Sequence, residues 1–214
     1  MASILLTGFE PFDGETINPS WQAVLRAQAL WDGPEQLNIA EIPVDFEAGD
    51  RSLAEALARF RPELVIAVGQ AGGRSGISLE RVAINVDDAR IPDNAGFQPV
   101  DAAIVADGPA AYFSTLPVKS CVAALAEAGI PASVSQTAGT YACNHLFYRL
   151  MHSLHAEHPH ARGGFVHIPF APEQVAGRDQ PSMSVDLVST ALLAIVRTTL
   201  DVTVDARIPG GALH

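Results

Sequence analysis

Segments typical of strands and of helices alternate along most of the chain, and this alternation restricts the fold more than any other feature. Apolar or β-branched runs predict strands, and runs with hydrophobic residues every three to four positions predict helices. The expected strands cover residues 3–9, 37–44, 63–70, 131–137 and 163–170, and the expected helices cover 18–31, 47–60, 116–129, 140–158 and 182–200. The alternation predicts an α/β fold, a three-layer α/β/α sandwich with a mostly parallel central sheet.

Residues 76–115 interrupt the alternation. The segment 77–93 has the pattern of a hairpin, and 94–117 is rich in turn residues. We therefore expect an inserted hairpin and loop region, which in a compact domain is usually functional or mobile. Because the insertion follows the strand at 63–70, we expect it over the carboxyl ends of the strands, where open α/β sheets bind ligands.

The composition limits the possible partners. With 214 residues, 48% of them hydrophobic, the chain is expected to form one globular domain over 1–214. A formal net charge of −11 argues against binding to nucleic acid or to an anionic membrane. The N-terminus lacks a basic region, and no stretch approaches the roughly 20 apolar residues of a membrane span, so a cytoplasmic location is expected.

One of the two cysteines, Cys143, is expected in the first turn of a helix. Free backbone N–H groups and the helix dipole favour a thiolate there, although free cysteine is also often simply buried. The dipole contributes only about 0.3–1 kcal/mol, less than one pKa unit, so a nucleophilic Cys143 needs a base. Cys121 lies in the middle of an apolar helix and is expected in the core.

The seven histidines of the chain differ in where they lie within the predicted helices and strands. Those at 152, 155, 158 and 160 follow the polar end of one helix without a cysteine or carboxylate at matching spacing, so we expect a solvated face and no metal site. His145 is two residues from Cys143 and hence on another helix face. His167 ends an apolar strand, where the sheet can present it to a site, although a lone histidine in such a position is more often structural until a partner is found.

Glu80 is a candidate partner for His167. A carboxylate in an apolar strand is costly to bury unless it is paired. It can form a salt bridge with Arg81 or Arg90, or it can hydrogen-bond a histidine and fix its tautomer, the third role that a nucleophile and its base require. The sequence does not establish that the three side chains meet.

The glycine-rich segment 69–76, "GQAGGRSG", invites comparison with phosphate-binding loops. It fits neither the dinucleotide nor the P-loop spacing, lacks lysine and leads into a strand-like segment. We expect these glycines to allow tight turns or close approach of a small ligand. A nucleoside-phosphorylase-like enzyme that uses this loop for phosphate, and a noncatalytic small-molecule binder, remain the alternatives to a thiol enzyme.

Four blocks together resemble the pyroglutamyl peptidase I family of cysteine peptidases: "LLTGFEPFDG", "GQAGGRSGISLERVAIN", "QTAGTYACNH" and "GFVHIPF". They lie in the family's order across residues 5–170, and "PSMSVDLV" extends the resemblance into the last helix. The resemblance implies removal of an N-terminal pyroglutamyl residue from peptides through a thioester acyl-enzyme. It implies Cys143 as nucleophile, His167 as general base and Glu80 as orienting acid, with no cofactor or metal, a cytoplasmic location and often a homotetramer.

The resemblance also implies a pocket for the pyroglutamyl ring. Such a flat, neutral lactam suits aromatic faces and a few fixed hydrogen bonds. By resemblance the pocket includes Phe9, Phe12, Asn18 and Gln70, with Arg90 near the backbone N–H groups that start the helix of Cys143. Core packing is the rival interpretation for the two phenylalanines, and a helix N-cap is the rival for Asn18.

Overall fold

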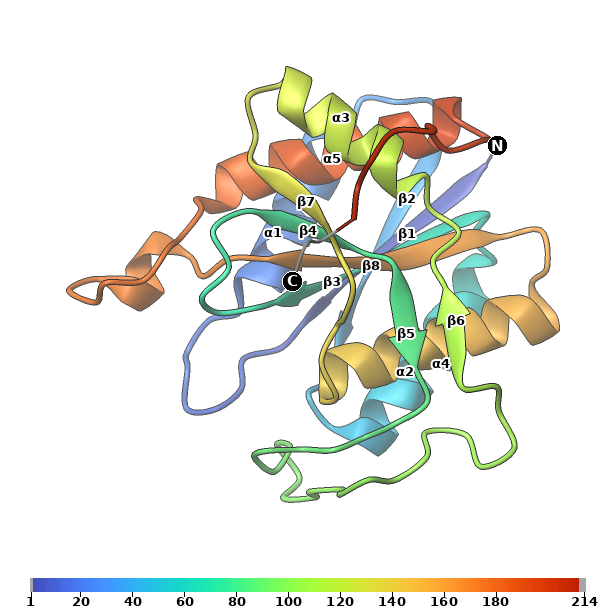
Figure 1. The fold of residues 1–214 in the computed structure, drawn as a ribbon, viewed down its shortest axis with the longest axis vertical. Coiled ribbons are helices and arrows are strands. Elements are labelled where there is room, and N and C mark those ends of the chain that lie inside the picture. The colour runs from blue at the N-terminus through green and yellow to red at the C-terminus, as the bar shows by residue number, and fades with distance from the viewer. Residues whose placement is uncertain (1, 212–214) are drawn as a thin grey trace.

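The computed structural model describes residues 2–211, and its strands and helices follow the expected alternation closely (Figure 1). The strands are β1 (Ser3–Phe9), β2 (Gln36–Ile42), β3 (Leu64–Gln70), β4 (Ile77–Glu80), β5 (Val82–Ile84), β6 (Ala111–Phe113), β7 (Ala132–Ser135) and β8 (Arg162–Ile168). The helices are α1 (Pro19–Leu30), α2 (Phe46–Phe60), α3 (Val118–Glu127), α4 (Ala142–Glu157), the short 3₁₀ helix η1 (Pro172–Val175) and α5 (Val185–Asp201).

The central sheet has six strands in the order β2-β1-β3-β8-β4-β7. Neighbours from β2 to β8 pair in parallel, β4 runs antiparallel to β8, and β7 runs parallel to β4. Helices α1, α3 and α5 cover one face, and α2 and α4 cover the other (Figure 1). This confirms the predicted α/β sandwich with a mostly parallel sheet.

Alternation along the strands divides the core into two hydrophobic clusters, one on each face of the sheet. In β8, Val166 and Ile168 pack in the cluster beneath α1, α3 and α5, whereas Phe165 packs in the cluster beneath α2 and α4. His167 has the parity of Phe165 and therefore points toward α4. In β4, Leu79 belongs to the first cluster, so Glu80 also points toward the face that α4 covers.

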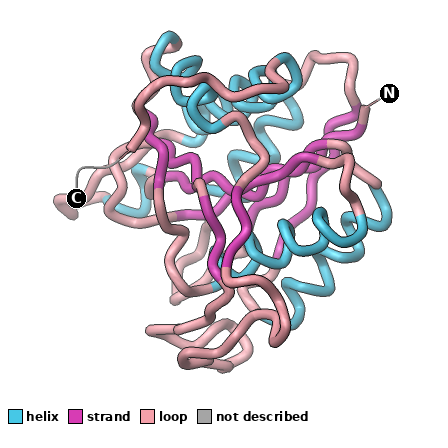
Figure 2. Tube along the Cα trace, turned by 45° about the vertical axis from the view of Figure 1, so that its right-hand side comes forward, coloured by secondary structure: helices cyan, strands magenta, loops and turns pink. Residues whose placement is uncertain are grey.

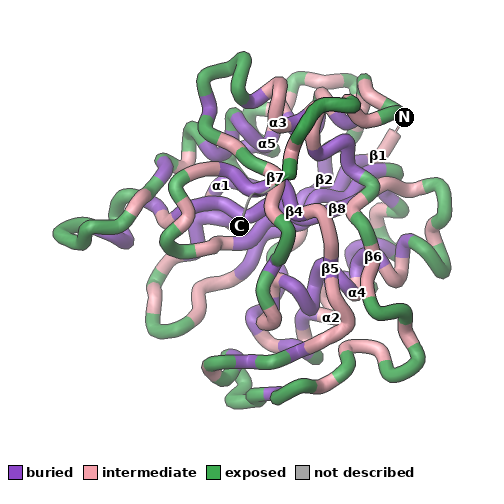
Figure 3. Tube along the Cα trace, in the orientation of Figure 1, coloured by how far each residue is buried: buried purple, intermediate pink, exposed green. Residues whose placement is uncertain are grey.

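The inserted region contains a hairpin, but not within residues 77–93. The chain leaves the central sheet at Arg81, and β5 pairs with β6 in a separate two-stranded antiparallel sheet. Between these strands the chain runs through loops at one end of the molecule (Figure 2). Their surface is largely exposed, with isolated buried residues such as Asp87 and Asp93 (Figure 3).

The insertion does lie near the carboxyl ends of strands, as expected. Asp93 accepts a hydrogen bond from the backbone N–H of Phe46, which opens α2. The N–H of Asn94 donates to the carbonyl of Val44, and its side chain contacts Glu10. Val44 and Glu10 follow β2 and β1, so the insertion closes over the edge at which these strands end. Among residues 2–211, no helix is both long and apolar enough to cross a membrane.

Candidate active site

Cys143 is the second residue of α4, where the sequence places it. Tyr141 is the N-cap residue and contributes no side-chain hydrogen bond to the helix start. The first intrahelical bond after the cap runs from the N–H of His145 to the carbonyl of Tyr141. The N–H groups before His145 therefore have no intrahelical acceptor. They lie beside a thiol that is partly exposed.

Gly69 connects Cys143 to His167. In the register of β3 and β8, Gly69 lies directly opposite His167. A Cβ atom added to Gly69 would lie 2.8 Å from the Sγ atom of Cys143. The thiol therefore occupies the space that a larger residue at position 69 would fill, and the backbone of Gly69 lies one strand spacing, about 4.8 Å, from that of His167. Glycine at this position lets α4 bring its sulfur close to the sheet.

His167 and Glu80 form a buried pair. The Nδ1 atom of His167 lies 2.7 Å from Oε1 of Glu80, and the two residues are 3% and 0% exposed. Because Nδ1 faces a carboxylate, the ring carries a proton there, which leaves Nε2 as the basic nitrogen. Adjacent strands hold the pair, since Ser78 in β4 lies opposite His167 in β8.

The salt-bridge partner of Glu80 is Arg74, not Arg81 or Arg90. The Nη1 atom of Arg74 lies 2.6 Å from Oε1 of Glu80, and its Nη2 atom donates to the carbonyl of Thr137. Arg81 turns away and donates to the carbonyl of Gly210. The sequence signal for Arg74 was its place in the glycine-rich segment before Glu80, but spacing alone does not identify it. Glu80 therefore has both a cationic and an imidazole partner.

The surroundings of Cys143 favour the uncharged thiol over the thiolate. Burial raises the pKa of Cys143 to about 12, the charge of Glu80 adds to this rise, and Arg74 opposes it. Burial lowers the pKa of His167, while the hydrogen bond to Glu80 and its charge oppose that shift. Both shifts favour the uncharged forms of the thiol and the imidazole. The helix start alone therefore does not activate the sulfur, and a base has to take its proton.

A small pocket opens beside the thiol. It is lined by Phe9, Phe12, Asn18, Val44, Gln70, Tyr141, Ala142 and Cys143. The structure therefore brings four of the expected binding residues next to Cys143. Asn18 also caps α1 by accepting a hydrogen bond from the N–H of Ser20, which is the helix-cap role expected as its alternative. Phe9 is 3% exposed, so it also packs in the core. Arg90 is exposed and, within residues 2–211, lies outside this lining.

This pocket is also lined by three residues that were not predicted from the sequence, Val44, Tyr141 and Ala142. The ring of Tyr141 lies 6.4 Å from that of Phe12, and its hydroxyl donates to the carbonyl of Pro92 in the insertion. An aromatic residue two positions before the cysteine was the available signal for Tyr141. Val44 follows β2 at the carboxyl edge of the sheet, but its side chain resembles any other core residue.

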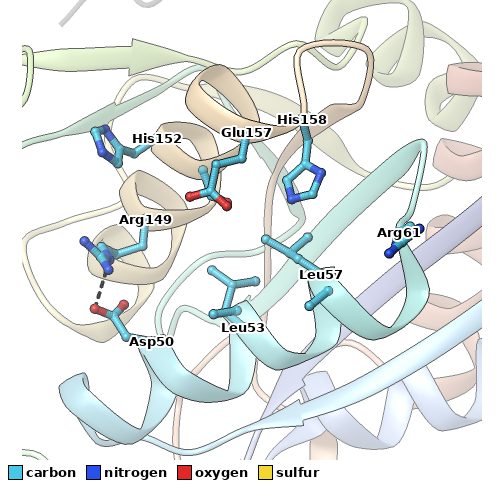
Figure 4. A pocket seen from close by; sticks show the side chains of 11 residues that line it. Asp50, Leu53, Leu57, Arg61, Arg149, His152, Glu157 and His158 are labelled. Carbon is cyan, nitrogen blue, oxygen red and sulfur yellow. Dashed lines mark ion pairs between the residues drawn. The ribbon is translucent and has the colours of Figure 1, made fainter.

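A roomier hollow lies between α2 and α4, away from the sulfur (Figure 4). Asp50 and Arg149 form an ion pair across it, at 2.9 Å. His152 and His158 lie toward opposite ends of the hollow and do not converge (Figure 4). Within the described residues, no group of three or more histidine, cysteine, aspartate or glutamate side chains is arranged to hold a metal ion.

Similarity to known proteins identifies the family of this chain. A family profile described as pyroglutamyl peptidase matches residues 2–202. This chain belongs to the pyroglutamyl peptidase family. Membership confirms the resemblance in the sequence blocks, and it confirms the enzyme class, a cysteine peptidase of the pyroglutamyl type.

Relatives and solved structures of the family match the chain over almost its whole length. The pyrrolidone-carboxylate peptidases of Clavibacter michiganensis and Cupriavidus taiwanensis are 56% and 55% identical, with 100% of each chain covered. Pyroglutamyl peptidase I from Bacillus amyloliquefaciens superposes with a TM-score of 0.94 at 48% identity, covering 98% of this chain and 100% of the other. Pyrrolidone carboxyl peptidase from Thermococcus litoralis gives 0.94 at 37% identity, with the same coverage.

Proposed function

We propose that the protein hydrolyses the bond after an N-terminal pyroglutamyl residue, with Cys143 as nucleophile, His167 as general base and Glu80 as the group that orients His167. One observation carries this proposal: Cys143 Sγ lies over Gly69, the register partner of a histidine whose Nδ1 is 2.7 Å from a fully buried carboxylate. A nucleophile, a base and an orienting acid are the three parts of a catalytic triad.

The reaction begins with transfer of the thiol proton to His167. Nε2 of His167 accepts the thiol proton while Sγ of Cys143 attacks the pyroglutamyl carbonyl carbon, and the resulting imidazolium is stabilised by Glu80. The unpaired N–H groups at the start of α4 are placed to bind the oxyanion. Collapse breaks the C–N bond, and the leaving amine takes the proton from His167. Water, deprotonated by the same nitrogen, then hydrolyses the thioester and releases pyroglutamate.

The pocket beside the sulfur accounts for the substrate. Its aromatic walls, Phe12 and Tyr141, suit the flat faces of a lactam ring, and Asn18 and Gln70 supply polar groups at its edge. The lining contains no charged side chain, in keeping with a neutral ring. Arg90 is proposed to contact the substrate beyond this pocket, a role that rests on the resemblance alone.

Hydrolysis of a chromogenic pyroglutamyl amide by the purified protein tests the proposal directly. Activity is expected without added metal or phosphate, and Cys143→Ala should abolish it. His167→Ala should lower kcat more than Glu80→Gln, because the orienting acid only assists a group that still transfers the proton. Full activity in Glu80→Gln would reduce Glu80 to an ion-pair partner of Arg74. An active Cys143→Ala protein would remove the thiol mechanism altogether.

A cytoplasmic location and a homotetramer remain predictions from the resemblance. Sedimentation equilibrium of the purified protein would determine the oligomeric state, and a mass of about one chain would contradict the tetramer.

A further inference from the structure

Gln174 lies behind the pocket rather than in it. It belongs to the short helix η1, which follows β8, and it is 8% exposed. The backbone N–H of Ala171 lies 2.9 Å from its side-chain oxygen Oε1. A backbone N–H can only donate, so this contact determines which end of the Gln174 amide is the oxygen and which is the NH₂ group.

The NH₂ group of Gln174 points to Gln70. Its Nε2 atom lies 2.9 Å from Oε1 of Gln70, and because Nε2 can only donate, the Gln70 atom must be the oxygen. The remaining polar group of Gln70 is its own NH₂, which has no hydrogen-bond partner among residues 2–211. Gln70 lines the pocket, and both N–H donors of this NH₂ group are unused, whereas its oxygen keeps one lone pair beside the bond from Gln174.

Asn18, the other side-chain amide of the pocket, is oriented in the same way. Its Oδ1 accepts from both the N–H and the hydroxyl of Ser20, and its Nδ2 donates to the carbonyl of Glu10. One N–H of Nδ2 remains after that bond. Each amide of the pocket therefore keeps at least one unused N–H donor, and the oxygen of Asn18 has both lone pairs occupied.

We propose that Gln174 is a specificity-determining positioning residue, which orients Gln70 so that the pocket presents an N–H donor to the carbonyl oxygen of the pyroglutamyl ring. This inference rests on the proposed function, since it names the substrate atom that Gln70 contacts. The backbone N–H of Ala171 can only donate, so it fixes the orientation of the Gln174 amide. Gln174 in turn fixes the orientation of the Gln70 amide in the pocket.

Gln174→Glu reverses this polarity with almost no change of shape. A carboxylate still accepts from the N–H of Ala171, but it cannot donate to Gln70. Gln70 then turns its NH₂ to the new carboxylate and presents its oxygen to the ring carbonyl, where two acceptors meet. We expect KM for a pyroglutamyl amide, and the inhibition constant of 2-pyrrolidone, to rise about 10- to 100-fold, with kcat changed less. Gln174→Met, which only releases Gln70, should raise KM by less than about 5-fold.

A double-mutant cycle separates this role from a general structural one. In a Gln70→Met background no amide remains to be turned, so Gln174→Glu should change KM by less than about 2-fold. Gln70→Glu provides a second route to the same reversal, since it keeps Gln174 and places an acceptor in the pocket. It should raise KM as Gln174→Glu does.

Melting temperatures of the four single variants and of the double variant show whether each is folded. If Gln174→Glu does not fold, the KM of Gln70→Glu tests the inference instead. An unchanged KM in folded Gln174→Glu and Gln70→Glu proteins would overturn the inference, as would an effect of Gln174→Glu that persists undiminished in the Gln70→Met background. A wild-type protein that fails to cleave any pyroglutamyl amide would instead overturn the proposed function.

Discussion

Arg74 and His167 share a single oxygen atom, Oε1 of Glu80, at 2.6 and 2.7 Å. The other oxygen, Oε2, is buried without a hydrogen-bond partner among the described residues. The carboxylate is therefore held by one cation and one imidazole on the same atom. Removing the cation would leave a buried charge with less compensation. Arg74 thus stabilises the carboxylate that orients His167.

Arg74→Met should accordingly lower kcat by about 10- to 100-fold, the range expected for a hydrogen bond to a charged group. The acid limb of the kcat/KM profile should move to higher pH, because burial and the charge of Arg74 both lower the pKa of His167, and removal of that charge lets the imidazole take up a proton more readily. Arg74→Lys keeps the charge but lacks the forked donors of arginine, so its kcat should lie between those of the wild type and of Arg74→Met. An Arg74→Met enzyme with the wild-type pH profile would show that Arg74 only fixes the loop to Thr137.

Gly69→Ala should displace the nucleophile. The new Cβ would lie 2.8 Å from Sγ of Cys143 and 2.7 Å from Cζ of Phe165, a fully buried ring that cannot move freely. Misplacing a reacting group by about 1 Å can cost about 100-fold in rate, so a loss of that size in kcat is expected. Gly211→Ala is the matched control, since its Cβ would meet nothing within 4 Å. Equal activity of the two variants would contradict the close approach of Sγ to β3.

The sequence predicted the layers and most of the site because these depend on local patterns. Apolar strands, helix starts such as Asn18 and strand-end residues such as His167 are readable from their neighbours in the chain. Pairing is not local. The change of sheet at Arg81 and the antiparallel direction of β4 depend on which distant strand lies alongside.

The same limit explains the missed site residues. Arg74 reaches Glu80 because a glycine-rich turn folds back onto β4, and arginine in a loop carries no sign of its partner. The order of hydrogen bonds from Gln174 to Gln70 joins residues 104 positions apart. The direction of the Cys143 pKa shift likewise depends on burial and on Glu80, neither of which the helix start reveals.

Iodoacetamide should label Cys143 and leave Cys121 unmodified in the folded protein. Cys121 is 0% exposed and packs in the core beneath α3 and α5, where the reagent does not reach it. Cys143 is partly exposed and has His167 nearby to take its proton. Mass spectrometry of digested protein after brief labelling at pH 7 measures both sites, with labelling in denaturant as the control. Similar modification of the two cysteines before denaturation would contradict the assignment of the nucleophile.

His145 should make stability depend on pH in the alkaline range. Its ring lies 2.7 Å from Asp87 in the insertion and 3.1 Å from Asp50 in α2, and Arg149 binds the other oxygen of Asp50. Burial lowers the pKa of His145, but the hydrogen bonds to Asp50 and Asp87 and their charges outweigh it and raise the pKa to about 9. The acidic side chains of Asp45, Glu47 and Asp93 line the adjoining hollow.

A raised pKa means that the folded protein binds the proton more tightly than the unfolded chain. The resulting stability is complete below the unfolded value of about 6.5 and is lost as the pH rises through about 9. The shift corresponds to roughly 3 kcal/mol. His145→Gln, neutral at every pH, should therefore be less stable than wild type at pH 6 and approach it at pH 10, as measured by urea unfolding. A constant difference across that range would show that His145 is not charged.

The pocket should distinguish pyroglutamyl from prolyl substrates by hydrogen bonding and not by ring size. Proline has the same five-membered ring without the lactam carbonyl, and it carries a protonated amine in place of the neutral amide. The N–H donors of Gln70 and Asn18 would face no acceptor in a prolyl complex. Unpaired groups in a site built for hydrogen bonding can cost about 10⁴- to 10⁵-fold in discrimination, whereas a missing methylene in an apolar slot costs only about 10- to 200-fold.

The prolyl ammonium adds a second penalty, because the pocket lining supplies no carboxylate to pair with it. We therefore expect kcat/KM for a pyroglutamyl amide to exceed that for the prolyl and glutaminyl amides of the same leaving group by at least about 10³-fold. The glutaminyl amide serves as the control for an open chain with the same side-chain carbonyl. Comparable rates on the pyroglutamyl and prolyl amides would mean that aromatic walls such as Phe12 and Tyr141 recognise ring shape alone, and the donors of Gln70 and Asn18 would have no part in specificity.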